Sequence, residues 1–301
     1  MKKCVLVTGA QGLVGSRFAE LYGQRNNLLT PQISEFNFLD IPLMEKYLKD
    51  KNITHVVNFA AFTDVSLGES ERGNKNGLCW RVNVTGVQNL TKMFNKNKVK
   101  FIHISTDMVF PGSSEDRGPY DEKHKPIDDP NVVTWYGYSK YEGEKVVQNY
   151  FRNPAIVRII YPVRARFDLK SDFLRKPLKL YEEGKLYPLF DDQHLSITFI
   201  DELYKVLKVI IEDEKSGIFH CSSDDQTTPH EIVSYLIEAK YGVKGVVKRA
   251  SIKDFLKTQE NPRRYPIFGG LRSTYSQQAL QIKFSGWKEI VNELLKQNIT
   301  P

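Results

Sequence analysis

Residues 3–15 read Lys3-Cys4-Val5-Leu6-Val7-Thr8-Gly9-Ala10-Gln11-Gly12-Leu13-Val14-Gly15. In this stretch an apolar, β-branched run breaks into glycines at every third position and then continues as helical sequence. Glycine is needed at such a turn because the strand must bend sharply into a helix and the backbone must come close to a pyrophosphate. The N–H groups at the helix start then attract the anion. The stretch therefore predicts a strand, turn and helix that bind a dinucleotide.

Similar apolar runs recur along the first half of the chain, before glycine or small-residue breaks. They cover residues 5–8, 55–61, 101–106 and 155–161, and helical patterns at 81–95 and 139–150 lie between them. Strands that alternate with helices predict an α/β fold, here a Rossmann-like doubly wound parallel sheet. Ligands of such sheets bind beyond the carboxyl ends of the strands. We therefore expect residues 9–15, 60–64 and 105–107 to converge on one crevice.

The length of 301 residues and an apolar content of 41% suit one large domain with a smaller one appended. We expect a Rossmann domain over residues 1–165 and a smaller C-terminal α/β substrate domain over 166–301. Residues of about 197–207, and the terminal helix from Trp287, are expected to return to the main sheet. Thr228-Pro229-His230-Glu231 predicts a helix start with a capping box. Gly68 to Gly77 reads as a surface loop or insertion.

Composition narrows the class of partner and the compartment. The formal charge is +7, yet Lys and Arg are spread among Asp and Glu, so we expect polyanionic small molecules and no nucleic acid as ligands. No apolar run reaches the ~20 residues of a membrane span, and residues 1–3 lead straight into a strand without a signal-type region. The three cysteines, Cys4, Cys79 and Cys221, are widely spaced, which predicts reduced thiols and a cytoplasmic protein.

No metal site is expected either. Four histidines lie in or near predicted strands without clustered carboxylates, which favours core or edge positions over metal ligation. They are His55, His103, His194 and His220.

A tyrosine and a lysine four residues apart carry the predicted chemistry. Tyr136 and Lys140 fall on one face of a helix, where an ammonium would lower the pKa of a phenol so that it exchanges protons near neutrality. The spacing Tyr-x-x-x-Lys occurs five times, at Tyr47, Tyr136, Tyr141, Tyr181 and Tyr204. Only Tyr136 starts the helix that follows the strand ending at Ser105 to Asp107. Tyr141 with Lys145 lies on the same helix but should face elsewhere.

The order of these motifs resembles the extended short-chain dehydrogenase/reductase superfamily over the whole chain. The motifs are the glycines at 9, 12 and 15, Asn58-Phe59-Ala60-Ala61, Asn83-Val84, Ser105-Thr106-Asp107, and Tyr136 with Lys140. Within the superfamily, four segments resemble the dTDP-4-dehydrorhamnose reductase family. They are residues 60–65, 105–112, 136–144 and Asp192-Gln193.

The resemblance implies roles for individual residues. Thr106 and Tyr136 would hydrogen-bond the substrate carbonyl, Lys140 would hold the ribose of NADP or NAD, and Tyr136 would supply the proton as hydride arrives from the nicotinamide. Asp107 joins Thr106 on the substrate side. The implied cofactor-binding residues are Gly9, Gln11, Gly12, Leu13, Val14, Gly15, Asp40, Ala60, Ala61, Asn83, Tyr136 and Lys140.

Some cofactor contacts have an alternative explanation. Asp40 resembles the family's adenine-side acid, but it is equally explained as a helix cap before Pro42. Near residues 30–35 only Glu35 is acidic, and Arg17 could either serve a 2′-phosphate or be a solvated helix residue. The choice between NADP and NAD therefore stays open.

Arginines are the candidates for binding a substrate diphosphate, because guanidinium groups match it bidentately. Arg158 ends a predicted strand near the crevice, and Arg263, Arg264 and Arg272 lie in an irregular segment. Ordinary surface charge is the alternative for each. We select Arg158 and Arg272 as substrate-binding residues, with Arg272 the stronger candidate.

The sequence departs from the family at positions that concern the substrate. Met108 stands where the family has tyrosine, Ile197-Thr198 stands where it has Pro-Thr, and Glu260 to Leu271 carries extra arginine, tyrosine and glycine. Related dehydratases place a glutamate after the Thr-Asp pair, and Met108 cannot replace that acid. Dehydration is therefore disfavoured, and the sugar is not fixed by the sequence.

These observations predict an NAD(P)H-dependent reductase of a nucleotide-linked 4-keto-6-deoxy sugar. One alternative is a nucleotide-sugar 4-epimerase, which oxidises and re-reduces without releasing its cofactor. Another is a dinucleotide-binding regulatory subunit, because the β subunit of methionine adenosyltransferase resembles the same family. Candidate partners are the nucleotide-sugar substrate and a second copy of the chain in a homodimer.

Overall fold

The computed structural model describes residues 3–23, 27–94, 99–259, 261 and 265–301. The chain divides into two compact units. Unit 1 comprises Met1–Val109, Pro126–Arg158 and Tyr204–Phe219, and unit 2 comprises Phe110–Lys125, Ile159–Leu203 and His220–Pro301. The chain thus first leaves unit 1 at residue 109 rather than at 165, and the segments that return to it are 126–158 and 204–219 rather than about 197–207. The helix from Trp287 stays in unit 2.

Unit 1 is built on a sheet of six strands in the order β2-β1-β3-β4-β5-β9. Their bounds are β1 Cys4–Thr8, β2 Asn27–Leu29, β3 His55–Asn58, β4 Lys100–Thr106, β5 Ala155–Ile159 and β9 Gly217–Cys221. β1 pairs in parallel with both β2 and β3, and β3 pairs in parallel with β4. The predicted doubly wound parallel sheet is confirmed. The chain order reverses between β1 and β3, where such sheets bind ligands.

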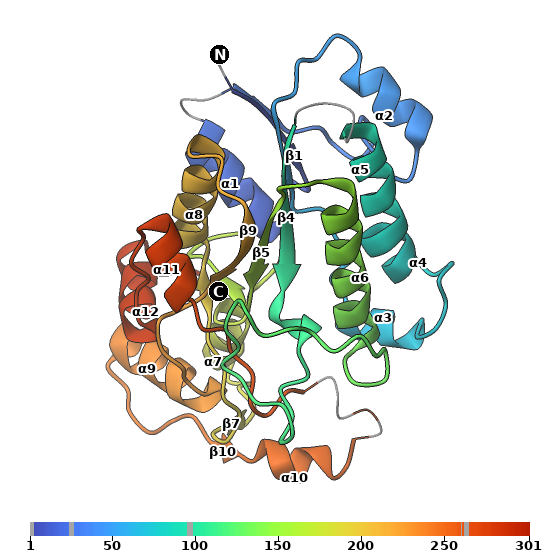
Figure 1. The fold of residues 1–301 in the computed structure, drawn as a ribbon. Coiled ribbons are helices and arrows are strands. Elements are labelled where there is room, and N and C mark those ends of the chain that lie inside the picture. Colours follow the sequence, from blue (N-terminus) through green and yellow to red (C-terminus); the bar gives the residue numbers. More distant parts are fainter. Residues whose placement is uncertain (1–2, 24–26, 95–98, 260, 262–264) are drawn as a thin grey trace. The chain divides into compact units, whose positions relative to one another are not determined.

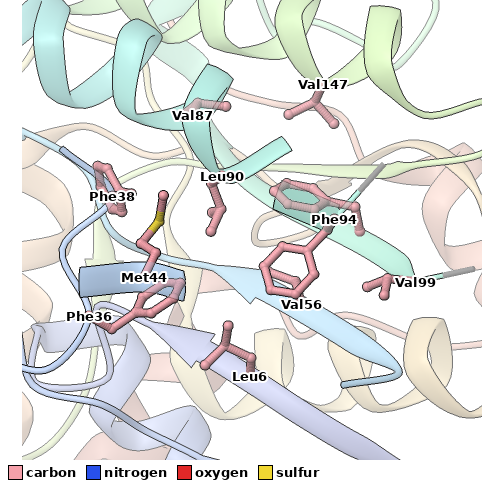
Figure 2. Packing of buried hydrophobic residues seen from close by; sticks show 11 residues of the cluster. Leu6, Phe36, Phe38, Met44, Val56, Val87, Leu90, Phe94, Val99 and Val147 are labelled. Carbon is pink, nitrogen blue, oxygen red and sulfur yellow. The ribbon is translucent and has the colours of Figure 1, made fainter. Parts of the chain in front are cut away.

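Helices cover both faces of this sheet (Figure 1). α1 (Leu13–Gly23) lies on one face, where Phe18 stacks against Tyr22 and also contacts Phe59. α5 (Val87–Phe94) and α6 (Trp135–Tyr150) lie on the other face (Figure 1). There Leu6 and Val56 of the strands pack under Leu90 and Phe94 of α5 (Figure 2). Phe101 of β4 belongs to the same buried cluster. Burial of these apolar faces fixes the strand ends and helix starts that form the site.

The remaining elements of unit 1 connect and cap these layers. They are α2 Ile41–Leu48, α3 Val65–Ser70, α4 Leu78–Trp80, the π-helix η1 Arg81–Gly86, the 3-10 turn η2 Asp107–Val109 and the later part of α8 Ile200–Glu212. The prediction of a surface loop from Gly68 is wrong at its start. Gly68 is buried inside α3, where an added Cβ would lie 3.3 Å from the Cys79 sulfur.

Unit 2 contains short strands and helices. β6 (Pro162–Val163) pairs with β8 (Thr198–Phe199), and β7 (Leu189–Phe190) pairs with β10 (Arg249–Ala250). The helices are α7 Arg175–Glu182, α9 Pro229–Tyr241, α10 Ile252–Leu256, α11 Thr274–Leu280 and α12 Trp287–Lys296. Thr228 caps α9 as predicted, by accepting from the Glu231 N–H at 3.1 Å. Glu231 does not complete a capping box, because its carboxylate accepts from the Thr227 hydroxyl instead.

Helix length bears on membrane association. Within the described ranges no helix is long and apolar enough to cross a bilayer. The longest of them, α6, has 16 residues, whereas a span needs ~20 apolar ones.

Candidate active site

The three glycines of the first turn meet different surroundings. Gly9 has a φ of +68°, and a Cβ there would lie 2.7 Å from the Ala60 nitrogen, so only glycine fits between β1 and the segment after β3. A Cβ on Gly15 would lie 2.3 Å from the Gly9 carbonyl oxygen. A Cβ on Gly12 would meet only that same oxygen, at an ordinary 3.4 Å. Gly9 and Gly15 are therefore required by the fold, and Gly12 is not.

The start of α1 provides a cradle for an anion. Gly12 is exposed and precedes Leu13, the first helical residue, and the turn is closed by a hydrogen bond from the Gly12 N–H to the Gly9 carbonyl at 3.1 Å. The amino end of a helix carries partial positive charge and unpaired N–H groups. Gln11, also exposed, donates to the carbonyls of Thr30 and Pro31. The exposed backbone at Gly12 favours the predicted pyrophosphate site, which stays a prediction.

The residues considered for the adenosine half have local partners. Asp40 caps α2 by accepting from the Leu43 N–H at 3.1 Å, as the alternative explanation has it. Arg17 forms an ion pair with Glu20 at 2.7 Å. Glu35 accepts from the Gln32 N–H at 2.8 Å. A cofactor contact of Asp40 stays a prediction.

Asn83 holds the segment that follows β3. It belongs to η1, and π-helical turns often occur at functional sites. Its amide oxygen accepts from the Phe62 N–H at 2.9 Å, and its nitrogen donates to the Phe62 carbonyl and to the Ser139 hydroxyl of α6. These bonds tie Phe62, the residue after Ala60 and Ala61, to η1 and through Asn83 to α6. Asn83 thus positions the segment that follows β3. A direct contact of Asn83 with a cofactor stays a prediction.

Tyr136 reaches the end of β4 because α6 begins very close to it. Thr134 caps the helix by accepting from the Gly137 N–H at 3.0 Å. A Cβ on Gly137 would lie 2.0 Å from the Met108 carbonyl oxygen, so this glycine allows the helix to approach η2. The Thr106 hydroxyl donates to Asp107 at 3.1 Å and lies close enough to the Tyr136 phenol to act on its pKa. The structure therefore brings three of the predicted residues together: Thr106, Asp107 and Tyr136.

Burial decides the protonation of these groups. It raises the pKa of Tyr136, and the charge of Asp107 adds to the rise while the hydrogen bond from Thr106 opposes it. The prediction that Lys140 lowers the pKa of Tyr136 is wrong for this arrangement, since the Lys140 ammonium is turned to other partners. Burial also raises the pKa of Asp107 to about 7, against hydrogen bonds from Thr106 and the backbone. Tyr136 accordingly holds its proton at neutral pH.

Lys140 differs from the lysines of the other four Tyr-x-x-x-Lys pairs. It is buried, with 3% of its surface exposed, whereas Lys51, Lys185 and Lys208 are exposed and Lys145 is partly exposed. Its Nζ donates to the Ile104 carbonyl at 2.7 Å and lies 3.4 Å from His103 Nε2. Burial lowers the pKa of Lys140 to about 8, although Glu144 opposes the shift. Lys145, by contrast, pairs with Asp128 and Glu142.

The two predicted substrate arginines have different surroundings. Arg158 is 1% exposed and forms a two-pronged ion pair with Glu144 of α6, Nε to Oε1 at 2.9 Å and Nη2 to Oε2 at 2.7 Å. Such a buried pair ties β5 to α6, so we assign Arg158 to the framework instead of to the substrate. Arg272, in unit 2, is exposed, and its substrate contact stays a prediction. Arg263 and Arg264 lie outside the described residues.

The sequence predicts His103 only as a core or edge histidine and assigns no role to Gly137 and Gly143, although all three shape the site. His103 is fully buried beside Lys140, and Gly137 and Gly143 let α6 approach the Met108 and Asn83 carbonyls. The signal for His103 was the alternation of β4, which puts it on the same face as Phe101, under α6. The glycines could not have been found without the position of the helix.

Comparison with known proteins shows the family and the fold of the chain. The family model described as RmlD substrate binding domain matches residues 1–299. A Haloferax volcanii protein named as a probable low-salt glycan biosynthesis reductase is 28% identical over 86% of this chain and 87% of its own length. A dTDP-4-dehydrorhamnose reductase of Aggregatibacter actinomycetemcomitans is 24% identical over 96% and 97%.

Among solved structures, the dTDP-4-dehydrorhamnose reductase of Bacillus anthracis in complex with NADP superposes with a TM-score of 0.84. The match covers 99% of this chain and 100% of the other, at 22% identity. At this identity the likeness confirms the fold.

Proposed function

The chain belongs to the RmlD substrate binding domain family, and from this premise we propose that it is an NAD(P)H-dependent reductase of a nucleotide-linked 4-keto-6-deoxy sugar. One observation carries the proposal. At the carboxyl end of β4 a buried, protonated Tyr136 lies next to the hydroxyl of Thr106, and a buried Lys140 lies one helical turn further along α6. A proton donor positioned next to a second hydroxyl suits a carbonyl that is being reduced.

The residues present fit a reduced nicotinamide dinucleotide. The open backbone at Gly12 and the start of α1 at Leu13 and Val14 would hold its pyrophosphate, and Lys140 would hold the nicotinamide-side ribose. When bound, the cofactor supplies the hydride.

The chain's own residues supply the proton. Tyr136 stays protonated at neutral pH because burial raises the pKa of its phenol, so its Oη–H can be given to the carbonyl oxygen of the sugar. The Thr106 hydroxyl would orient the same oxygen. After transfer the phenolate is left in a buried site, one helical turn from the buried Lys140. Asp107, with a pKa of about 7, would bond a sugar hydroxyl.

A panel of nucleotide-linked 4-keto-6-deoxy sugars tests the proposal, with NADPH and NADH supplied separately. We expect stoichiometric oxidation of the reduced cofactor with at least one sugar, and loss of this turnover in Tyr136→Phe but not in Tyr141→Phe. Epimerised product without net cofactor oxidation would instead identify a 4-epimerase. Cofactor binding without either reaction would identify a regulatory subunit.

We further propose a homodimer in the cytoplasm, with substrate recognition assigned to unit 2. The buried, unpaired thiols of Cys4, Cys79 and Cys221 support a reducing compartment. Sedimentation at several concentrations tests the dimer, and fractionation of cells tests the location.

A further inference from the structure

Four buried polar side chains form a continuous line across the sheet of unit 1. The Thr8 hydroxyl lies 2.5 Å from Asn58 Oδ1, Asn58 Nδ2 lies 3.1 Å from His103 Nδ1, and His103 Nε2 lies 3.4 Å from Lys140 Nζ. The four side chains are 3%, 1%, 0% and 3% exposed. The line runs from the strand end before Gly9 to the lysine of the candidate active site.

The backbone register creates this line. Thr8 is the direct partner of Asn58 in the β1–β3 pairing, and Asn58 is the direct partner of His103 in the β3–β4 pairing. Paired residues of neighbouring strands project to the same side. α6 then covers that side, and a Cβ on its Gly143 would lie 3.7 Å from His103 Nε2, an ordinary contact. Glycine is required at position 143 because a Cβ there would lie 2.6 Å from the Asn83 carbonyl oxygen.

The chemistry of the four groups allows two directions of hydrogen bonding. Burial keeps His103 neutral, because burial and the nearby Lys140 charge lower its pKa well below the usual value. A neutral imidazole has one N–H and one acceptor nitrogen. If Lys140 is an ammonium, it donates to Nε2, and Nδ1–H must donate to the amide oxygen of Asn58. If Lys140 is an amine, Nε2–H donates to it, and Nδ1 accepts from the amide nitrogen.

We propose that His103 is a positioning residue for Lys140, and that the direction of the Thr8–Asn58–His103–Lys140 line follows the charge on Lys140. When Lys140 is an ammonium, the Asn58 side-chain amide is rotated by about 180°. Its oxygen then accepts from His103 Nδ1–H and its nitrogen donates to the Thr8 hydroxyl. As the pH rises, the exchange breaks the N–H bond at Nδ1, forms one at Nε2 and rotates one amide. The net result is one proton, lost by Lys140, released to water.

Other groups around Lys140 set the pH at which this exchange occurs. The Ile104 carbonyl, at 2.7 Å, is the shorter of its two partners and favours the ammonium. Glu144 on the next turn of α6 also favours it, although Glu144 is itself paired with Arg158 of β5. Cys79 of α4 lies near enough to act in the same sense. Against these, burial lowers the pKa of Lys140 to about 8.

Nitrogen NMR of the wild-type protein tests the proposal directly. The two ring nitrogens of His103 have shifts that identify the tautomer, and through-bond correlation to the backbone assigns them without any variant. We expect the Nδ1–H tautomer below about pH 7 and the Nε2–H tautomer above about pH 9. A single tautomer over this whole interval, or an imidazolium at neutral pH, would overturn the proposal. So would an unchanged pH dependence in Lys140→Met.

Paired substitutions test the consequence for catalysis, which rests on the proposed function. His103→Gln places an amide where Nε2 was and keeps a partner for Lys140, whereas His103→Asn reaches only toward Asn58. We expect His103→Asn to move the alkaline limb of kcat/KM down by about one pH unit, and His103→Gln to restore it. If His103→Asn and His103→Gln have equal melting temperatures and the same pH profile of kcat/KM, the positioning role is refuted. The NMR measurement needs no substrate, so it stands even if the reductase assignment fails.

Discussion

Gly12→Val separates cofactor binding from folding. A Cβ at Gly12 would meet only the Gly9 carbonyl oxygen, at an ordinary 3.4 Å, and the residue is exposed. The variant should therefore fold. A pyrophosphate that approaches this backbone would, however, meet the isopropyl group.

The expected loss follows from the contacts that the phosphates would give up. If the pyrophosphate is pushed away from the start of α1, at least two hydrogen bonds between N–H groups and an anion are lost. Such bonds contribute about 1.5 to 3 kcal/mol each, so the loss should be about 3 kcal/mol or more. That corresponds to a dissociation constant for NADPH raised by a factor of about 100 or more.

Calorimetric titration with NADPH and NADH measures this, together with the melting temperature of each variant. Gly15→Ala is the matched control, because its Cβ would lie 2.3 Å from the Gly9 carbonyl oxygen and should lower the melting temperature itself. An affinity for both cofactors within a factor of about two of wild type in folded Gly12→Val would refute the placement of the pyrophosphate.

Further predictions concern the groups around α6 and in unit 2. Tyr136→Phe should lower kcat by about 10²- to 10⁴-fold and leave NADPH affinity nearly unchanged, and an equal loss in Tyr141→Phe would contradict its role. Burial raises the pKa of Asp107 to about 7 in the folded protein, above its usual value near 4. The stability it contributes is therefore present below about pH 4 and is lost as pH rises through about 7. Between about pH 4 and 7 the unfolding free energy of Asp107→Asn, measured by urea titration, should therefore fall less than that of wild type. The same pH dependence in both proteins would exclude a raised pKa for Asp107. Arg158→Met leaves Glu144 buried and unpaired, which should lower the unfolding free energy by about 3 to 5 kcal/mol and leave KM for the sugar unchanged. A raised KM without that loss of stability would show that Arg158 binds the substrate. Arg272→Ala should raise KM for the nucleotide sugar more than the Kd for NADPH, and the reverse result would place it elsewhere.

The fold was readable from the sequence because its signals are local. The apolar run before Gly9 and the helical pattern after Gly15 each reflect a few neighbouring residues, and the parallel sheet follows from their alternation. Tyr136 could also be selected, since its place depends only on the order of strand and helix. The end of β3 was predicted three residues too late, because Phe59 to Ala61 are apolar but leave the sheet to approach Gly9.

What the sequence could not show depends on depth of burial and on distant partners. The sequence around an arginine at a strand end does not reveal whether its side chain binds a ligand or a carboxylate of the protein. Arg158 binds Glu144, which lies 14 residues earlier in the chain. The division into units differs for a similar reason, because residues 110–125 follow β4 directly yet join unit 2 through contacts such as Tyr120 with Leu271. No local pattern encodes either contact.

The pKa of Tyr136 also bears on the choice between a reductase and an epimerase. An epimerase must first remove a proton from a sugar hydroxyl, which needs a phenolate, whereas a reductase starts with the phenol. Burial and the charge of Asp107 both favour the phenol, and the ammonium of Lys140 is bonded to Ile104 and stands beside His103. The site is thus set to give a proton before it can take one. That order is the one that reduction requires.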